Sequence, residues 1–146
     1  MMATSQPGPL GAEQQRELKL ICMNNLLAAT DVRLYFKDLL SRFVLINIGF
    51  MAAYAPGRTP EELIGKTDFD VFSYSHAYAA RLDEQEIIRT GQPIFGKVER
   101  ETYKDRADAW VLTTKLPLRD ERGRIIGTFG ISRDITAQMA AGSQHS

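Results

Sequence analysis

Strand-like runs stand on both sides of a helix-like central stretch, and this order constrains the fold more than any other feature of the chain. Two runs rich in β-branched and aromatic residues come first, over residues 32–38 and 43–46. Three more follow the central stretch, over residues 94–101, 110–116 and 124–133, with turn signals between them. Strands joined by short turns pair antiparallel. We therefore predict an α+β domain, in which a five-stranded antiparallel sheet has helices over one face.

Helix signals precede the first strand and fill the centre of the chain. Apolar residues recur at three- and four-residue steps over residues 12–29, which predicts an amphipathic entry helix. In the centre, a long helix is predicted from about Ser75 to Arg89, ended by Gly91. Shorter helical pieces, interrupted by Pro and Gly, come before it.

The same signals divide the chain into four parts. We expect a disordered lead-in over residues 1–11 and the entry helix within residues 12–30. The folded domain is expected over residues 31–136, and residues 137–146 are expected to be an exit segment, either the start of a linker or disordered.

Composition and charge exclude several classes of protein. The 18 Lys and Arg residues balance 18 Asp and Glu residues, whereas nucleic-acid binders usually show a basic excess, so no nucleic-acid partner is expected. Cys22 is the one cysteine, which rules out an intramolecular disulfide. No run approaches the roughly 20 apolar residues that cross a bilayer, and the N-terminus lacks a secretory signal. A cytoplasmic protein without a membrane anchor is therefore expected.

Several local sequences resemble the PAS family of sensor domains. The strongest stretch spans residues 110–136 and ends on Asp134-Ile135-Thr136. Residues 60–70 resemble the helical middle of the same family, and residues 35–38, 42–43 and Asn47 resemble its opening hairpin. The order and spacing of these motifs cover most of the chain, from about Val32 to Thr136.

The resemblance implies a sensor of bacterial signalling proteins such as sensor kinases and diguanylate cyclases, and no enzyme. Asp134 and Thr136 are the expected signal exit, because each can accept from free N–H groups of a following helix. The sequence ends 10 residues after Thr136, without a kinase or cyclase region. The output domain is thus expected on another polypeptide or on a longer form of this chain, for example in a two-component system.

A ligand pocket is expected between the sheet and the helices. Alternation along the last strand puts Phe129 and Ile131 on one face, and Gly127 and Gly130 mark places where a ligand or another backbone approaches closely. The candidate pocket residues are aromatic or aliphatic: Phe50, Phe69, Phe72, Tyr78, Trp110, Leu112, Phe129 and Ile131. They predict a largely apolar pocket for a small apolar ligand. The alternative is that they simply fill the core.

No cofactor is strongly indicated. In haem-binding PAS sensors a histidine on the long helix is the axial iron ligand, but His76 shares its helical row with Asp83, which indicates that this row meets water. We therefore expect a partly exposed histidine and no metal. Flavin photosensors of this family need a cysteine near residues 68–72 and tend to keep a glutamine where Phe129 stands, so flavin is not expected.

The sequence does not predict a hydrolase-type active site or a metal site. Ser73, Ser75 and His76 lack an orienting carboxylate and a glycine-framed nucleophile turn. Asp68 and Asp70 are interpreted as helix-capping groups rather than as metal ligands.

The entry helix supplies a second functional hypothesis. Its apolar stripe includes Leu18, Ile21, Cys22 and Leu26, and such a stripe must cover either its own sheet or the helix of a partner. We predict homodimerisation through these residues. The chain is thus expected to be a sensor domain that binds a small ligand or a protein partner, or else a constitutive dimerisation module with a filled core.

Overall fold

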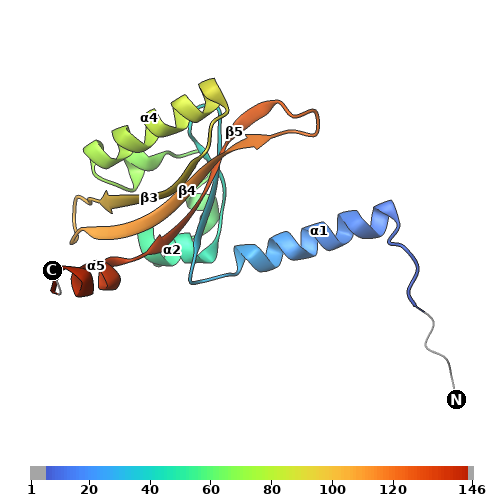
Figure 1. Ribbon diagram of the computed structural model, residues 1–146, viewed down its shortest axis with the longest axis horizontal. Helices are drawn as coiled ribbons and strands as arrows, with labels where there is room; N and C mark the ends of the chain where they lie inside the picture. Colours follow the sequence, from blue (N-terminus) through green and yellow to red (C-terminus); the bar gives the residue numbers. More distant parts are fainter. Residues whose placement is uncertain (1–5, 145–146) are drawn as a thin grey trace, which may run out of the picture.

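The computed structural model describes residues 6–144 and shows one five-stranded antiparallel sheet with helices packed on one face (Figure 1). The strands are β1 (Arg33–Asp38), β2 (Phe43–Ile46), β3 (Ile94–Glu101), β4 (Ala109–Arg119) and β5 (Ile125–Asp134). The helices are α1 (Ala12–Leu27), α2 (Ile48–Tyr54), α3 (Pro60–Leu63), the 3-10 helix η1 (Asp68–Asp70), α4 (Tyr74–Thr90) and α5 (Thr136–Gln144). This confirms the predicted α+β architecture. Within the described part of the chain, every helix is too short or too polar to cross a bilayer.

The strand order β2-β1-β5-β4-β3 brings the two ends of the domain together in the middle of the sheet. β1 and β5 are antiparallel neighbours, and their register pairs Arg33 with Ser132 and Asp38 with Gly127. The start of β1 therefore lies beside the end of β5. As a result α1 and α5, which flank these strands in sequence, attach to the same end of the sheet.

Side-chain caps fix the helices that cover the sheet. The buried Asn47 accepts from the backbone N–H of Phe50 at the start of α2, and its amide also donates to the carbonyls of Ala29 and Val32. α4 starts after Ser73, and it stops where Gly91 adopts a left-handed conformation (φ 72°), which glycine takes without steric cost. The predicted long helix and its end are confirmed.

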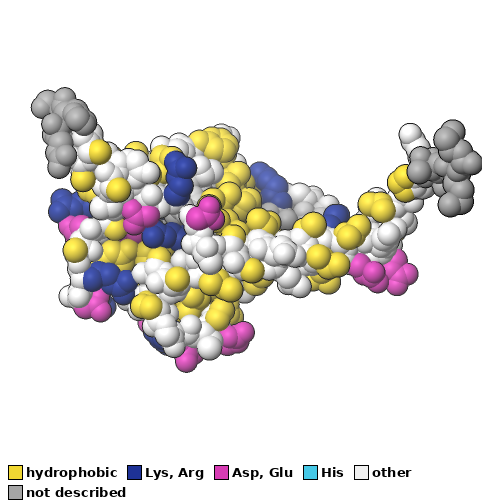
Figure 2. Space-filling model, turned by 90° about the horizontal axis from the view of Figure 1, so that it is seen from below, with side chains coloured by type: hydrophobic (Ala, Val, Ile, Leu, Met, Phe, Trp, Pro, Cys, Tyr) yellow, Lys and Arg dark blue, Asp and Glu magenta, His cyan; other side chains and the backbone are white. Residues whose placement is uncertain are grey.

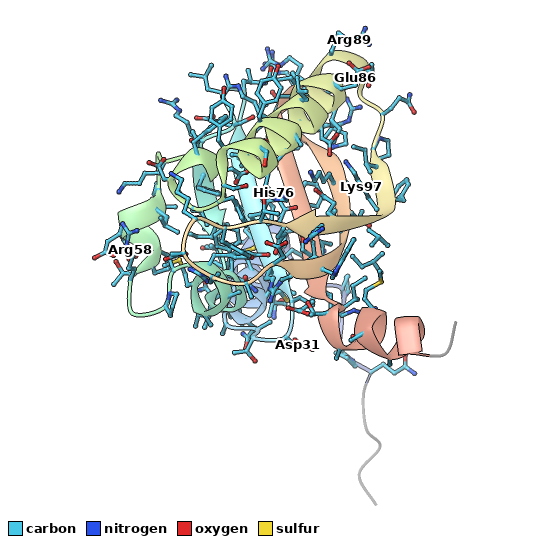
Figure 3. The ribbon with its side chains drawn as sticks, turned by 90° about the vertical axis from the view of Figure 1, so that its left-hand side faces the viewer. Asp31, Arg58, His76, Glu86, Arg89 and Lys97 are labelled. Atoms are coloured by element: carbon cyan, nitrogen blue, oxygen red, sulfur yellow. The ribbon has the colours of Figure 1, made fainter. Side chains whose placement is uncertain are left out.

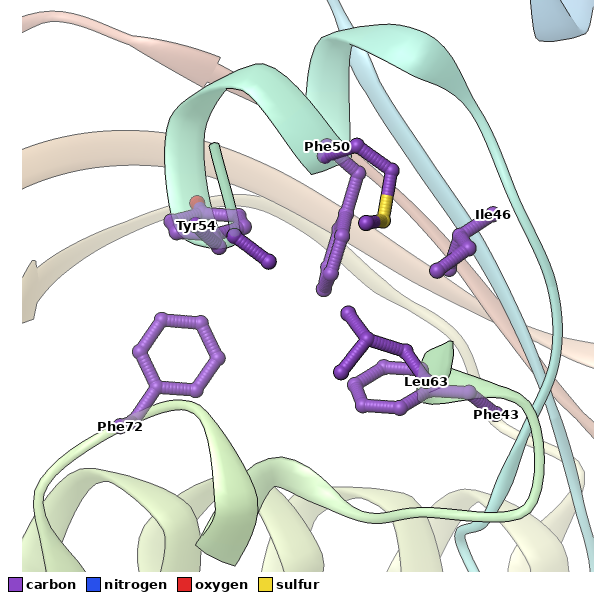
Figure 4. Close-up of a cluster of buried hydrophobic side chains, with 8 residues drawn as sticks. Phe43, Ile46, Phe50, Tyr54, Leu63 and Phe72 are labelled. Atoms are coloured by element: carbon purple, nitrogen blue, oxygen red, sulfur yellow. The ribbon is translucent and has the colours of Figure 1, made fainter. Parts of the chain in front are cut away.

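An apolar core lies between α2, α3, η1 and β2, and Figure 4 shows its main side chains converging. Its buried members are Phe43, Ile46, Phe50, Met51, Tyr54, Ala55, Leu63 and Phe72. Tyr54 packs edge-on against two neighbours, with ring centroids 4.7 Å from Phe50 and 4.9 Å from Phe72. This core occupies one end of the inner layer and leaves the central strands to face α4.

α1 projects from the domain instead of folding back on the sheet (Figure 1). None of its residues is buried. The predicted stripe is open to solvent: Leu18, Ile21 and Leu26 are 39%, 55% and 51% exposed, and Cys22 is exposed too. Packing of this helix on its own sheet, the alternative considered above, is therefore not what the structure shows.

The glycines of β5 allow β1 to pack closely. A Cβ on Gly127 would lie 1.9 Å from the carbonyl oxygen of Lys37, and a Cβ on Gly130 would lie 2.2 Å from the ring of Tyr35. The close approach predicted at these glycines is therefore made by β1 of the same chain. It holds the inward side chains of β1 in their places.

We expect Gly127→Ala to destabilise the fold by about 3 kcal/mol, the upper end of what overpacking costs, because the obstructing atom belongs to the backbone. Urea denaturation of the variant measures the loss. Gly8→Ala is the control, since nothing lies within 4 Å of its added Cβ. Equal stability of the two variants would contradict the close packing of β1 on β5.

Candidate functional site

β4 turns its polar row toward the helices. Val111, Thr113 and Lys115 are buried beneath the helical layer. Side chains alternate between the two faces of a strand, so Trp110 and Leu112 lie on the opposite face and are only half-buried. The prediction that these two residues line an inner pocket is wrong.

β5 shows the same arrangement. Thr128 and Ser132 are buried on the inner face, whereas Ile131 is 41% exposed on the outer face. The ring of Phe129 also lies outside, where it stacks on Phe36 at a centroid distance of 5.4 Å. Both strands were predicted with the wrong face inward, because a shift of one residue exchanges the faces and the more apolar row was assumed to be internal.

The remaining pocket candidates divide evenly. Phe50 and Phe72 are buried and line the inner cavity described below. Phe69 packs instead against Tyr74, with ring centroids 5.3 Å apart, and Tyr78 is 49% exposed. Both lie outside the cavity.

A cavity of about 30 Å³ lies between α4, α2 and the central strands. It has room for roughly two or three water molecules. Its lining consists of Tyr35, Lys37, Phe50, Tyr54, Asp68, Phe72, His76, Ala80, Glu84, Glu99, Glu101, Val111, Lys115 and Ser132. Four of these residues carry carboxylates and two carry ammonium groups, so the lining differs from the largely apolar pocket that was expected.

Lys37 is the centre of the charged lining. Its Nζ donates to Asp68 Oδ2 at 2.8 Å and to Glu84 Oε2 at 2.5 Å, and all three residues are buried. Burial alone would lower the pKa of Lys37, but the two carboxylates outweigh this effect and raise the pKa above its ordinary value. For Glu84 burial has the opposite effect and raises the pKa, so Glu84 is more readily protonated than an exposed glutamate.

A second charged group lies beside the first. Lys115 Nζ is 3.0 Å from Asp83 Oδ2 and 3.4 Å from Glu99 Oε1, and Lys97 Nζ also donates to Asp83 Oδ2 at 2.7 Å. Burial would lower the pKa of Lys115, but the neighbouring Tyr35, Glu99 and Asp83 raise it overall. The second lysine is therefore charged and paired.

His76 is half-buried, as predicted, but the reason given for its exposure is wrong. Asp83 does not mark a wetted row of α4, because it pairs with the two lysines of the sheet. Ala80 and Ile87 of the same row are buried, and His76 lines the cavity. Burial lowers the pKa of His76, which favours a neutral ring. Within residues 6–144, no group of three or more His, Cys, Asp or Glu residues has the arrangement of a metal site.

A third polar group connects the cavity with the end of the sheet. Glu101 accepts from the hydroxyls of Tyr54 (2.7 Å) and Tyr103 (2.9 Å). Arg33 donates to the Tyr54 hydroxyl at 3.2 Å and to Asp134 Oδ2 at 3.4 Å. Burial raises the pKa of Glu101 above its usual value.

The predicted exit residues lie where this group ends. Asp134 accepts from the backbone N–H of Thr136 at 2.8 Å, at the start of α5. Thr136 does not cap the helix as expected; its hydroxyl accepts from the backbone N–H of Trp110 on β4 at 2.9 Å. Both residues therefore tie the exit helix to the sheet.

Hydroxyl groups join the three central strands between these charged groups. The Tyr35 hydroxyl lies 3.2 Å from Thr113 Oγ1 and 3.3 Å from Ser132 Oγ, which are 2.6 Å from each other. The inward row of β1 thus contacts the first charged group through Lys37, these hydroxyls through Tyr35 and the third polar group through Arg33.

Sequence reasoning missed most of this site. Asp70 does cap η1, by accepting from the backbone N–H of Thr67, but Asp68 is buried against Lys37. A usable signal was present: β1 and β4 each carry a lysine on the row opposite their bulky apolar residues, and α4 carries adjacent acids, Asp83 and Glu84. Buried lysines require such partners.

A family profile and a curated relative both match most of this chain. The sequence profile described as PAS fold matches residues 27–140. The methanogenesis regulatory histidine kinase FilI of Methanothrix harundinacea is 34% identical over 110 residues, which is 75% of this chain and 12% of the kinase. The chain therefore spans a small part of that relative.

Solved structures agree with this assignment. VqmA of Vibrio cholerae is 28% identical, with a TM-score of 0.68 over 83% of this chain and 52% of VqmA, and one VqmA structure is described as bound to DPO (28% identity, TM-score 0.66, 80% and 57% covered). The PAS domain of a Colwellia psychrerythraea protein shares the fold at 19% identity, with a TM-score of 0.66 over 82% of this chain and 98% of that domain.

Lys37→Met is expected to destabilise the fold by about 3–5 kcal/mol at pH 7, because two buried carboxyl groups lose their common cation. Without the ammonium group, burial raises the folded-state pKa of Glu84 further above the unfolded value. The variant is therefore more stable at low pH, where the buried carboxyl is neutral, and becomes less stable as pH rises. The difference in stability between wild type and variant should be smaller at pH 4 than at pH 7.

Chemical denaturation at both pH values measures this loss. Lys104→Met is the matched control, because Lys104 is exposed. If the two substitutions cost the same, or if the loss at Lys37 does not depend on pH, the buried ion pairs do not contribute as described.

Proposed function

This chain belongs to the PAS family, and we propose that it is the sensor domain of a signalling protein, which binds a small ligand in the charged cavity beneath α4 and relays occupancy to an output domain. PAS domains are sensory modules, and we propose no catalytic role for this one. The proposed location is the cytoplasm, in keeping with a lone, exposed cysteine.

The inward row of β1 is the observation that carries the relay. Lys37 binds the carboxylates of η1 and α4, Tyr35 binds the hydroxyls of β4 and β5, and Arg33 reaches Asp134 at the start of α5. A ligand that shifts the charged groups of the cavity thus acts on one strand whose other end holds the exit helix. Relay in this sense requires that the ligand bind two arrangements of this strand with different affinity.

The relatives support a ligand and an output domain. VqmA has been solved with DPO bound, and FilI is a histidine kinase. By analogy we propose that this domain binds a ligand, and the charged lining of the cavity favours a small polar one. We also propose a kinase or another output domain in the same or another polypeptide, as in two-component systems. One VqmA structure contains DNA, but VqmA is about twice as long as the region matched here. That this domain itself binds no nucleic acid stays a prediction.

A second candidate function, constitutive dimerisation, is favoured by the exposed apolar surface. α1 exposes Leu18, Ile21 and Leu26, and the outer face of the sheet exposes Val98 and Ile131. Figure 2 shows hydrophobic side chains along α1 and on the adjoining part of the domain. We propose that a second copy of the chain covers this surface, and VqmA is likewise described as a dimer.

We expect Arg33→Met to loosen α5, because Asp134 loses its link to the cavity. Hydrogen exchange of the wild-type and variant chains measures this effect, and the α5 amides should exchange at least about tenfold faster while the β4–β5 amides keep their protection. Arg58→Met is the control, since Arg58 forms an exposed ion pair with Glu62. If hydrogen exchange in α5 is unchanged, Arg33 does not relay ligand binding to α5.

Native mass spectrometry tests the dimer. The wild-type chain should appear as a dimer, and Ile21→Glu should raise its dissociation constant by at least about tenfold, because a charge enters the apolar contact. Ile64→Glu is the control, since Ile64 is 43% exposed and directly follows α3, in the helical layer. A monomeric wild-type chain would rule the dimer out. Mass that leaves on denaturation would reveal a bound ligand.

A further inference from the structure

We propose that the cavity binds the head group of a small organic cation with N–H donors, of the amine or amidine class, and that the ligand enters past His76. This inference rests on the proposed sensor function and names the chemistry of its ligand. Three features carry it: an unpartnered carboxylate oxygen, the balance of charge in the lining, and a surface groove that shares residues with the cavity.

The unpartnered oxygen belongs to Glu84. Its Oε2 accepts from Lys37, but Oε1 is the one buried side-chain polar atom in the described chain that has no hydrogen-bond partner. Glu84 is 2% exposed and lines the cavity. Leaving a buried acceptor unpaired is costly, and the group that pairs with a carboxylate oxygen must be a donor.

The charge balance selects a cation over an anion. The lining holds the carboxylates of Asp68, Glu84, Glu99 and Glu101 but only the two ammonium groups of Lys37 and Lys115. Both lysines already bind carboxylates, so neither is free to receive an anionic ligand. A cation next to Glu84 would bring the buried charges closer to neutrality.

The rest of the lining suits an organic cation. Phe50, Tyr54 and Phe72 contribute aromatic rings to the lining. Cations bind favourably over the faces of such rings, particularly where water is excluded. An amidinium group adds planar, paired N–H donors that match the geometry of a carboxylate.

A surface groove of about 340 Å³ between α4 and β3 supplies the route. His76 and Glu99 line both this groove and the inner cavity, so their side chains form the partition between the two. Figure 3 shows His76 beneath α4, on the side turned toward β3. The ligand would enter between these two side chains, and Glu99 would attract a cation at the entrance.

Three molecules of nearly the same shape test the charge requirement. Acetamidinium, acetamide and acetate each have a planar group of four non-hydrogen atoms, but they are cationic, neutral and anionic. Ligands of this size bind with dissociation constants no lower than about 40 μM. Amide chemical-shift titration of the wild-type chain can measure affinities well above this value, and it does not depend on any variant folding.

We expect acetamidinium to bind at least about tenfold more tightly than acetamide or acetate, a difference of about 1.4 kcal/mol. The shifts should include amides of α4 and η1 around Glu84. Equal affinity for the three molecules would overturn the proposal. So would no saturation by acetamidinium up to about 50 mM, roughly a thousandfold above the limit for its size; the cavity would then hold water.

Two matched variants locate the binding group. Glu84→Gln keeps the shape of the side chain and should reduce acetamidinium affinity at least about tenfold, to the level of acetamide. Glu86→Gln is the control on the same helix, because Glu86 is exposed and pairs with Arg89 at the far end of α4 (Figure 3). Unchanged affinity in Glu84→Gln would place the ligand elsewhere and contradict the assignment.

Failure of this inference can be told apart from failure of the proposed function. If acetamidinium does not bind but Arg33→Met still loosens α5, the relay remains and the ligand has a different chemistry. If acetamidinium binds at Glu84 but Arg33→Met leaves α5 unchanged, the site is real and the relay is not.

Discussion

The ammonium group of Lys37 joins three elements that come from different parts of the sequence: β1, η1 and α4. Buried ion pairs add little net stability, because desolvation offsets their attraction, but breaking one is expensive. The position of α4 over the sheet is therefore fixed by charge as well as by the apolar core, which lies to one side of it. The carboxylates gathered around Lys37 and Lys115 line the cavity beneath α4.

The sheet consequently has a polar inner face over its centre and an apolar outer face. Thr113, Lys115 and Ser132 point inward, whereas Phe129 and Ile131 point outward. An outer face of this kind, next to a helix with no buried residue, fits a surface that a second copy covers. The proposed ligand sensing and the proposed dimerisation thus both rest on one distribution of side chains across the sheet.

The sequence was sufficient for the architecture but not for the site. Turn residues and alternation located all five strands and the end of α4 at Gly91, because these signals are local. The inward face of β4 and β5 was predicted wrongly, since alternation defines two rows and does not say which is internal. The partners of Lys37 and Asp83 were missed because they come from distant elements, and no local pattern records a contact between residues 37 and 84. The family resemblance did place Asp134 and Thr136 at the start of the exit helix.

We infer that the buried charges and the exit helix form one coupled unit through β1. Hydrogen exchange of Glu84→Gln and of the wild-type chain measures this coupling, because the substitution changes one charge in the cavity and lies outside β5 and α5. Coupling through Lys37, Tyr35 and Arg33 predicts altered protection at the amides of Ile135 and Thr136 as well as around Glu84. Changes confined to α4, η1 and the Lys37 region of β1 would contradict the account and leave the charged cavity as a structural feature without a path to the output.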